Sequence, residues 1–286
     1  IIALVAECSE PARRSAQVML ITASHPLGGA IRGTIMTIFP ALDWRIIFHV
    51  GRWWPLLLAV VMVRWLPESP AFLAERPKKK DSTQAPSLSL ATALFRQGRA
   101  PATLLLWVGF FFCVLAIYLI ISWLPSLLVS QGYSAREATF AALAFPLGGA
   151  IGTLVLGLLV ARWSRKAVVT GAFAGIVISV AGLAAAPHDI AMMLAASLAT
   201  GFFVIGSQFL LYGLSPTYYP SSIRGTGVGA AVAVGRLGSI AGPVLAGILI
   251  GAGQPPAHVL MSIVPGVFLA FLAAFALTRI PAAAED

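Results

Sequence analysis

The chain has 286 residues, of which 59% are hydrophobic and only 10% are charged, and its formal net charge is +9. About a quarter of the residues in a soluble domain are charged, so this composition excludes a soluble globular protein and predicts one whose solvent is the lipid bilayer. The Lys and Arg residues lie between apolar runs and form no surface interleaved with aromatic residues, which argues against a nucleic-acid-binding protein.

Apolar runs long enough to cross a membrane recur along the chain. A spanning helix needs about 20 mostly apolar residues, and these runs are too long and lack the polar alternation of membrane strands. We therefore predict an all-α polytopic membrane protein. Residues 1–6 resemble the tail of an earlier helix, so we interpret the sequence as a fragment of a longer protein. The predicted spans are residues 15–40, 46–66, 102–125, 138–161, 167–186, 190–214, 226–250 and 259–278.

The loops between these spans differ sharply in charge. With the spans crossing alternately, one side receives only Arg45 and Arg136. Cytoplasmic loops carry an excess of Lys and Arg, so the opposite side is predicted to be cytoplasmic, together with both ends of the chain. The basic residues assigned to it are Arg13, Arg14, Arg64, Arg76, Lys78, Lys79, Lys80, Arg96, Arg99, Arg162, Arg165, Lys166, Arg224 and Arg279.

Two features indicate how the helices are grouped. Residues 67–101 contain the polar run ERPKKKDSTQAPS and are predicted to link two helical bundles; the basic run holds the loop inside or, alternatively, binds anionic lipid. The run PLGGAI occurs at residues 26–31 and again at 146–151, and Pro243 interrupts a third span. A proline in every third helix fits the three-helix repeats of many transporters, although Gly-rich faces also serve close helix packing.

Three motifs stand in order at predicted helix ends. Residues 65–70 read WLPESP, residues 157–166 read GLLVARWSRK, and residues 219–227 read YPSSIRGTG. They resemble the PESPRFL signature, the G-x-L-x-D-R-x-G-R-R loop and the YP-x-x-x-R-x-T-G element of major facilitator transporters. The resemblance implies the major facilitator fold, with helices five to twelve of twelve present.

The same resemblance implies a division of the chain. Residues 1–66 would be the remainder of the N-terminal six-helix bundle, namely the end of helix four with helices five and six. Residues 67–101 would be the cytoplasmic loop between the bundles. Residues 102–286 would be the C-terminal bundle, helices seven to twelve.

Finer matches point to one family within this group. TLLLW at residues 103–107, SWLP at 122–125 and GRLG at 235–238 resemble helices seven and eleven of the aromatic acid/proton symporters. The resemblance implies proton-coupled uptake of small aromatic carboxylates by alternating access, with the proton as coupling ion and no other cofactor. We expect a monomer in the plasma membrane, in contact with the lipid bilayer, with its C-terminus in the cytoplasm.

Arg236 is the first candidate for the substrate site. A charge inside the membrane costs about 2.5–3.5 kcal/mol on insertion scales, so it usually faces a cavity and marks function. Its guanidinium can hold a carboxylate through two parallel hydrogen bonds, or it can pair with carbonyls or an acid inside the bundle. His25, also deep in a span, can titrate near neutral pH and take part in proton coupling, or simply pack. Arg32 lies nearer the external end, where its side chain can snorkel.

Further polar and aromatic residues are candidates for lining a cavity that accepts an aromatic ring. Gln208 would fix polar substituents of the substrate. Tyr and Trp near helix ends are also common anchors at the membrane interface. The candidates are Tyr118, Trp123, Gln208 and Tyr212.

Charged residues of the three motifs are implied by the resemblance to control the conformational change: Glu68, Arg162, Arg165 and Arg224. The chain departs from the family pattern in the loop after residue 160, where Ala161 replaces the acid and Ser164 replaces the glycine. The two loop arginines therefore lack the acidic partner of a network that stabilises the outward-facing state.

Other functions remain open at the level of sequence. One is a carrier of sugars, other organic ions or drugs, and another is a transport-incompetent membrane fragment or scaffold. A cationic substrate would favour a membrane acid, and none of the 10 Asp and Glu residues lies deep in a predicted span, which favours an anion. No Ser/His/Asp set, metal-ligand cluster or phosphate-binding Gly loop is present, so the chain is predicted not to be an enzyme.

Overall fold

The computed structural model describes residues 2–10, 13–38, 44–65, 94–96, 98–185 and 189–281. Within these ranges the regular structure is helical and contains no strand, which confirms the all-α prediction. The helices are α1 (Ile2–Glu7), α2 (Arg14–Thr22), α3 (Ser24–Ile38), α4 (Trp44–Trp65), α7 (Ala100–Ser130), α8 (Ala135–Arg162), α9 (Arg165–Ala184), α10 (Ile190–Leu214), the 3-10 helix η1 (Ser215–Tyr218), α11 (Ser221–Gly251), α12 (Pro256–Met261) and α13 (Val264–Leu277).

Six helical segments in the described part of the chain are long and apolar enough to cross a membrane. They correspond to the last six predicted spans, mostly with ends several residues longer. The two earlier predicted spans correspond to α2 with α3, and to α4. The six segments are Ala100–Ser130, Ala135–Arg162, Arg165–Ala184, Ile190–Tyr218, Ser222–Gly251 and Pro256–Leu277.

The predicted span of residues 15–40 is not one continuous helix, because a turn at Ala23 separates α2 from α3. The Thr22 hydroxyl donates to the Val18 carbonyl at 2.8 Å, a bond that competes with the backbone ladder. Pro26 follows and has no N–H to donate to the preceding turn. The last span is divided in a similar way between α12 and α13, with Pro265 in the first turn of α13.

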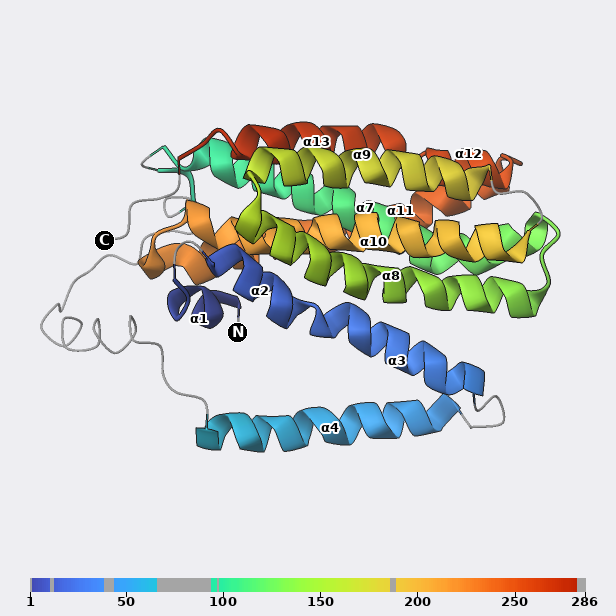
Figure 1. The fold of residues 1–286 in the computed structure, drawn as a ribbon, viewed down its shortest axis with the longest axis horizontal. Coiled ribbons are helices and arrows are strands. Elements are labelled where there is room, and N and C mark those ends of the chain that lie inside the picture. The colour runs from blue at the N-terminus through green and yellow to red at the C-terminus, as the bar shows by residue number, and fades with distance from the viewer. Residues whose placement is uncertain are drawn as a thin grey trace, which may run out of the picture.

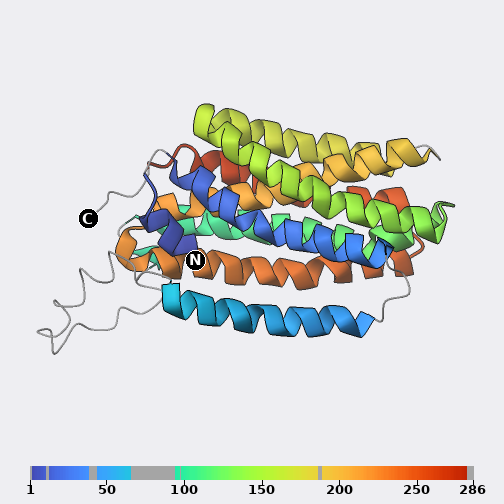
Figure 2. The same cartoon turned by 60° about the horizontal axis from the view of Figure 1, so that its bottom comes forward.

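The long helices run side by side along a common direction (Figure 1). α8 packs most extensively against α10, and α7 against α11, while α2 and α3 lie along α8. α4 lies at the edge of the molecule in both views (Figure 1, Figure 2). α1 and the C-terminal end of α13 lie at the same end of the bundle (Figure 1). We call this the α1 end.

Glycines allow α8 and α10 to approach closely. A Cβ built on Gly148 would lie 1.9 Å from the Leu198 carbonyl oxygen, and one on Gly152 would lie 2.1 Å from the Phe202 carbonyl oxygen. These two glycines are four residues apart, so they share one face of α8 and form the small-xxx-small pattern of membrane helix pairs. The Ser197 hydroxyl adds a bond of 2.7 Å to the Ala141 carbonyl across the same interface.

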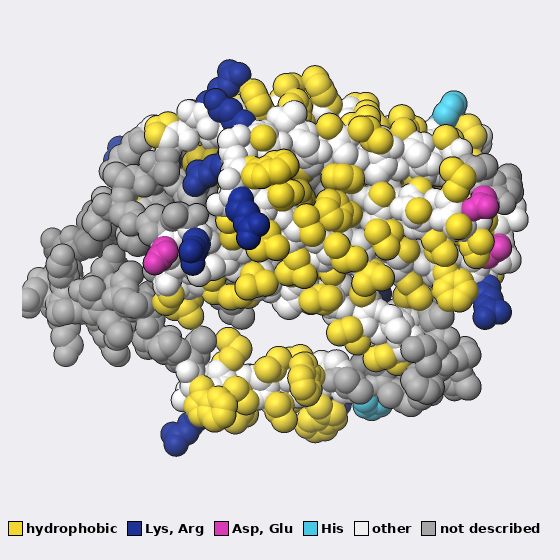
Figure 3. Space-filling model, viewed as in Figure 1, with side chains coloured by type: hydrophobic (Ala, Val, Ile, Leu, Met, Phe, Trp, Pro, Cys, Tyr) yellow, Lys and Arg dark blue, Asp and Glu magenta, His cyan; other side chains and the backbone are white. Residues whose placement is uncertain are grey.

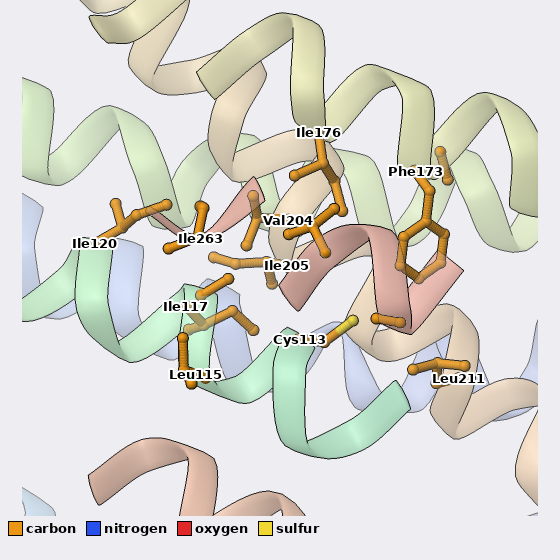
Figure 4. Packing of buried hydrophobic residues seen from close by; sticks show 14 of the residues in the cluster. Cys113, Leu115, Ile117, Ile120, Phe173, Ile176, Val204, Ile205, Leu211 and Ile263 are labelled. Atoms are coloured by element: carbon orange, nitrogen blue, oxygen red, sulfur yellow. The ribbon is translucent and has the colours of Figure 1, made fainter. Parts of the chain in front are cut away.

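The core is apolar and so is much of the outer surface. Figure 4 shows buried side chains of α7, α9 and α10, among them Cys113, Ile117, Ile176 and Val204, that belong to one apolar cluster. Outside this core, hydrophobic side chains cover the flank of the bundle (Figure 3), and Ile178 is 73% exposed. In water such a surface would be unfavourable, so it is explained by contact with lipid. Lys and Arg side chains gather mainly toward the α1 end (Figure 3).

Candidate functional site

A cavity of about 170 Å³ lies between α3 and the helices α7, α8, α10 and α11. Its walls therefore come both from the N-terminal part of the chain and from the C-terminal helices. We call it the central cavity. Five of the predicted site residues line it: His25, Tyr118, Gln208, Tyr212 and Arg236. Its other lining residues are Pro26, Gly29, Val114, Ile117, Ile121, Pro146, Ile205, Phe209 and Val232.

Arg236 lies at the centre of α11, about 22 Å from either helix end at 1.5 Å per residue. This is deeper than the sequence predicted, because α11 begins at Ser221 rather than at residue 226. One guanidinium nitrogen, Nη1, donates to the Tyr118 hydroxyl of α7 at 3.2 Å. The remaining guanidinium N–H groups form no other bond that the described residues show, so a planar anion can still be held by the guanidinium.

The approach of α7 and α11 depends on a glycine beside the arginine. A Cβ on Gly238 would lie 2.2 Å from the Phe111 carbonyl oxygen, so only glycine permits this spacing of the two backbones. Gly235 faces the same helix, with its Cβ position 3.4 Å from the Phe110 Cβ. The GRLG run therefore brings α7 close enough for Arg236 to reach Tyr118.

Gln208 is a buried amide without a hydrogen-bond partner among the described residues. Its side chain is 3% exposed, and neither the amide nitrogen nor the amide oxygen is bonded. Leaving a buried polar group unsatisfied costs about 1–3 kcal/mol. Because Gln208 lines the central cavity, a bound group with both a donor and an acceptor, such as a hydroxyl, can satisfy it.

Aromatic rings form the wall beside this amide. Phe209 stacks on Tyr212 with centroids 5.5 Å apart, and Phe110 meets Tyr212 edge-on at 4.8 Å. His25 reaches the same wall from α3, with its ring 5.9 Å from Phe209. It also lies close enough to Arg236 for the two to interact electrostatically. The cavity thus combines one fixed cation, an imidazole, an amide and an aromatic wall.

Trp123 is the predicted cavity residue that lies outside this group. Its indole Nε1 donates to the Pro243 carbonyl of α11 at 3.1 Å, and its ring lies 3.6 Å from the Cβ position of Gly247. Trp123 therefore holds α7 against α11. Sequence reasoning missed Phe209, which follows Gln208 directly, and the two prolines of the repeated PLGGAI run. Pro26 and Pro146 both line the cavity, and Pro146 packs 3.6 Å from the Cβ position of Gly29.

Comparisons with known proteins agree with this arrangement. The family described as Major Facilitator Superfamily matches residues 106–286, more than half of the chain, and the family described as Sugar (and other) transporter matches residues 3–92. The chain belongs to the major facilitator superfamily. This confirms the resemblance inferred from the motifs. It also confirms the expectation that the protein is not an enzyme, because the second matched family and the relatives below are described as transporters.

Comparison with individual proteins identifies more specific relatives within the superfamily. The chain is 39% identical over 277 residues to the 3-(3-hydroxy-phenyl)propionate transporter of Escherichia coli K12, covering 97% of this chain and 66% of the relative. It is 30% identical to the 4-hydroxybenzoate transporter PcaK of Acinetobacter baylyi, covering 84% of this chain and 59% of that one. A gallate transporter of Pseudomonas putida is 29% identical, with 87% and 61% covered. The chain therefore spans less than two thirds of the length of these relatives.

A solved structure supports the fold. The crystal structure of the E. coli fucose:proton symporter FucP superposes with a TM-score of 0.69 at 16% identity, covering 96% of this chain and 72% of that one. This likeness confirms the major facilitator fold.

Those motif residues of the superfamily that the structure describes lie away from the central cavity. Glu68 falls outside the described residues. Arg162 is exposed at the end of α8 and, with Arg13, lines a separate cavity of about 550 Å³ between α2 and α8. Arg165 lies beside the Tyr218 hydroxyl, which donates to the Leu277 carbonyl at 2.8 Å. A gating role for these residues stays a prediction.

Arg224 of the YP-x-x-x-R-x-T-G motif is buried rather than free to move. Its Nε donates to the Pro216 carbonyl at 3.2 Å and faces the Tyr219 carbonyl at 3.4 Å, so it fixes the turn between η1 and α11. The Tyr219 hydroxyl donates to the Thr103 hydroxyl of α7 at 3.1 Å. Gly227 makes room for this ring, because a Cβ there would lie 2.6 Å from it. The motif therefore anchors the start of α11 to α7.

Proposed function

We propose that the protein takes up small aromatic carboxylates, coupled to protons, by alternating access. The observation that supports this most strongly is the central cavity, where the Arg236 guanidinium, the unpaired Gln208 amide and the Phe209–Tyr212 wall face one space. In this proposal the carboxylate pairs with Arg236, the ring packs on the aromatic wall and a ring hydroxyl bonds Gln208. The relatives are named for aromatic carboxylic acids, which fits that chemistry.

The proton is proposed to bind within the same cavity. His25 supplies the imidazole that lines this cavity, and among the described residues no Asp or Glu lines it. Protonation of His25 and binding of the carboxylate would each favour one arrangement of the two bundles through a difference in affinity. In such folds the bundles rock about a site near the bilayer midplane, and the position of Arg236 at the centre of α11 supports such a site.

A competition experiment tests the substrate class against the alternatives of sugars, other organic ions and drugs. Uptake of radiolabelled 4-hydroxybenzoate, by protein expressed from its complete gene, is expected to be inhibited by unlabelled aromatic carboxylates. The corresponding amides, which carry no charge for Arg236, and monosaccharides should not compete. Equal competition by the amide would contradict the carboxylate site. Absence of any uptake would contradict the proposed function and favour a membrane scaffold.

Replacement of Gln208 by Leu is expected to change substrate preference. The half-saturating concentration of 4-hydroxybenzoate should rise about three- to tenfold, because a net hydrogen bond contributes about 0.5–1.5 kcal/mol. Benzoate lacks the ring hydroxyl, so its half-saturating concentration should stay the same or fall. The measurement is the ratio of the two values in wild type and variant, and benzoate serves as the internal control. An unchanged ratio would remove Gln208 from substrate recognition.

The proposed topology places the α1 end in the cytoplasm of a plasma-membrane protein. Lys166, at the start of α9, should then be cytoplasmic, and the exposed His258 of α12 should be external. In a background with the exposed Cys8 changed to Ser, Lys166→Cys and His258→Cys are expected to react with a membrane-impermeant maleimide from opposite sides of sealed vesicles. Reaction of both from the same side would reject the topology.

A further inference from the structure

A second cavity of about 300 Å³ adjoins the central cavity and contains another arginine, Arg32. The two cavities share the lining residues Gly29, Ile121 and Pro146, so they lie next to each other between α3, α7 and α8. Arg32 and Thr139 are the polar side chains of the second part. We call this part the outer cavity, because it lies toward the end of the bundle opposite α1.

One face of α3 lines both parts. His25, Pro26 and Gly29 line the central cavity, and Gly29, Arg32 and Gly33 line the outer one. These positions follow the i, i+3, i+4, i+7 spacing of a single helix face. Arg32 is seven residues beyond His25, which places it about 10 Å further along the helix at 1.5 Å per residue. Arg32 therefore lies further than His25 from the central cavity, toward the end of the bundle opposite α1.

The charge of Arg32 is not neutralised within the described part of the chain. Its side chain is exposed and forms no hydrogen bond or ion pair there. The nearest acid along α8 is Glu137, whose carboxylate accepts bonds of 2.8 Å from the backbone N–H and the hydroxyl of Ser134 and so caps that helix. A guanidinium with no counter-charge among the described residues, in a mostly apolar cavity, attracts an anion more strongly than one in bulk water, because the effective dielectric constant is lower.

We propose that Arg32 forms an outer binding site for the substrate carboxylate, from which the anion passes to Arg236. This inference rests on the proposed function. The outer site captures an aromatic carboxylate from the external side, and Gly29, one of the three residues that line both cavities, contributes no side chain to the boundary between them. A positively charged entry raises the local concentration of an anionic substrate, so Arg32 acts on capture rather than on the central binding step.

The test compares initial uptake rates of radiolabelled 4-hydroxybenzoate over a range of concentrations. Protein expressed from its complete gene is used, and rates are normalised to membrane abundance. Arg32→Gln is expected to raise the half-saturating concentration about tenfold, as the loss of a charge-assisted contact predicts, while the maximal rate stays close to wild type. Arg136→Gln is the matched control. It removes the same charge from the same end of the bundle, but Arg136 stacks on Phe140 at 5.8 Å and lines neither cavity.

A charge-rescue experiment separates electrostatics from shape. Arg32→Cys is treated with a cationic aminoethyl or an anionic sulfonatoethyl methanethiosulfonate, and the same treatment of wild type controls for Cys8 and Cys113. The cationic adduct is expected to lower the half-saturating concentration toward wild type, and the anionic adduct to raise it further. Equal effects of the two adducts would overturn the outer site.

The remaining outcomes are also decisive. An active wild type with an unchanged half-saturating concentration in Arg32→Gln would refute the outer site and leave the proposed function intact. A wild type that takes up no aromatic carboxylate would refute the proposed function, and the outer site with it. Loss of membrane abundance in Arg32→Gln and Arg32→Cys, but not in Arg32→Lys, would assign Arg32 to folding instead.

Discussion

Replacing Arg236 with Gln is expected to reduce uptake of aromatic carboxylates by about a hundredfold or more. The guanidinium can donate two hydrogen bonds to a carboxylate, and each charge-assisted bond is worth about 1.5–3 kcal/mol, while every 1.4 kcal/mol corresponds to about a factor of 10. Arg236→Lys keeps the charge but loses the planar fork, so uptake should fall between wild type and the Gln variant. The measurement is the initial rate of 4-hydroxybenzoate uptake, normalised to membrane abundance.

A matched control for this experiment is Arg279→Gln. Arg279 follows α13, stacks on Phe275 at 4.9 Å and does not line the central cavity, so its loss should leave uptake unchanged. Wild-type uptake by Arg236→Gln would remove Arg236 from the substrate site. Loss of membrane abundance in both the Gln and the Lys variants would show that Arg236 is needed for folding, as a partner of Tyr118.

Gly201→Ala is expected to abolish most of the folded protein. A Cβ at this position of α10 would lie 1.8 Å from the Phe145 carbonyl oxygen of α8, and backbone atoms cannot move aside as a flexible side chain can. Overpacking costs about 1–3 kcal/mol even where side chains can adjust, and here the two helices would have to separate. Because total stability is only about 5–15 kcal/mol, such a loss should lower membrane abundance and the melting temperature of the detergent-solubilised protein.

The control variant is Gly171→Ala on α9. Its Cβ would have no heavy atom within 4 Å, so it should be tolerated, and alanine favours a helix by about 0.5–1 kcal/mol over glycine. Equal melting temperatures of Gly201→Ala and Gly171→Ala would contradict the close contact between α8 and α10.

The membrane helices were predictable because each one requires a long apolar run, and α10 ends at Leu214, as expected. The breaks within two of the predicted spans, between α2 and α3 and between α12 and α13, were not predicted. Such breaks depend on local hydrogen bonds such as that of Thr22 to Val18. The start of α11 was placed too late, because the polar Ser221 and Arg224 belong to its first turn. Hydropathy locates the membrane-embedded part of a helix and does not locate the helix ends outside it.

The candidate site was predictable only in part. A charge in the middle of a predicted membrane span identified Arg236, and its contact with Tyr118 required two glycines whose partners lie on another helix. Trp123 and Tyr118 are five residues apart, which places them about 140° apart around α7 at 3.6 residues per turn, so they cannot both face one cavity. The role proposed for Arg32 depends on α3 lining two adjoining cavities along one face, which the sequence alone does not show.

Accumulation of radiolabelled 4-hydroxybenzoate in proteoliposomes tests most directly whether the central cavity belongs to a proton-coupled carrier of aromatic carboxylates. With protein expressed from its complete gene and an inside-alkaline pH gradient, the acid is expected to accumulate above its external concentration. A protonophore should abolish the accumulation, and Arg236→Gln should abolish it without collapsing the gradient. Uptake by wild-type vesicles no faster than by protein-free vesicles, or accumulation that Arg236→Gln leaves unchanged, would contradict the proposed function.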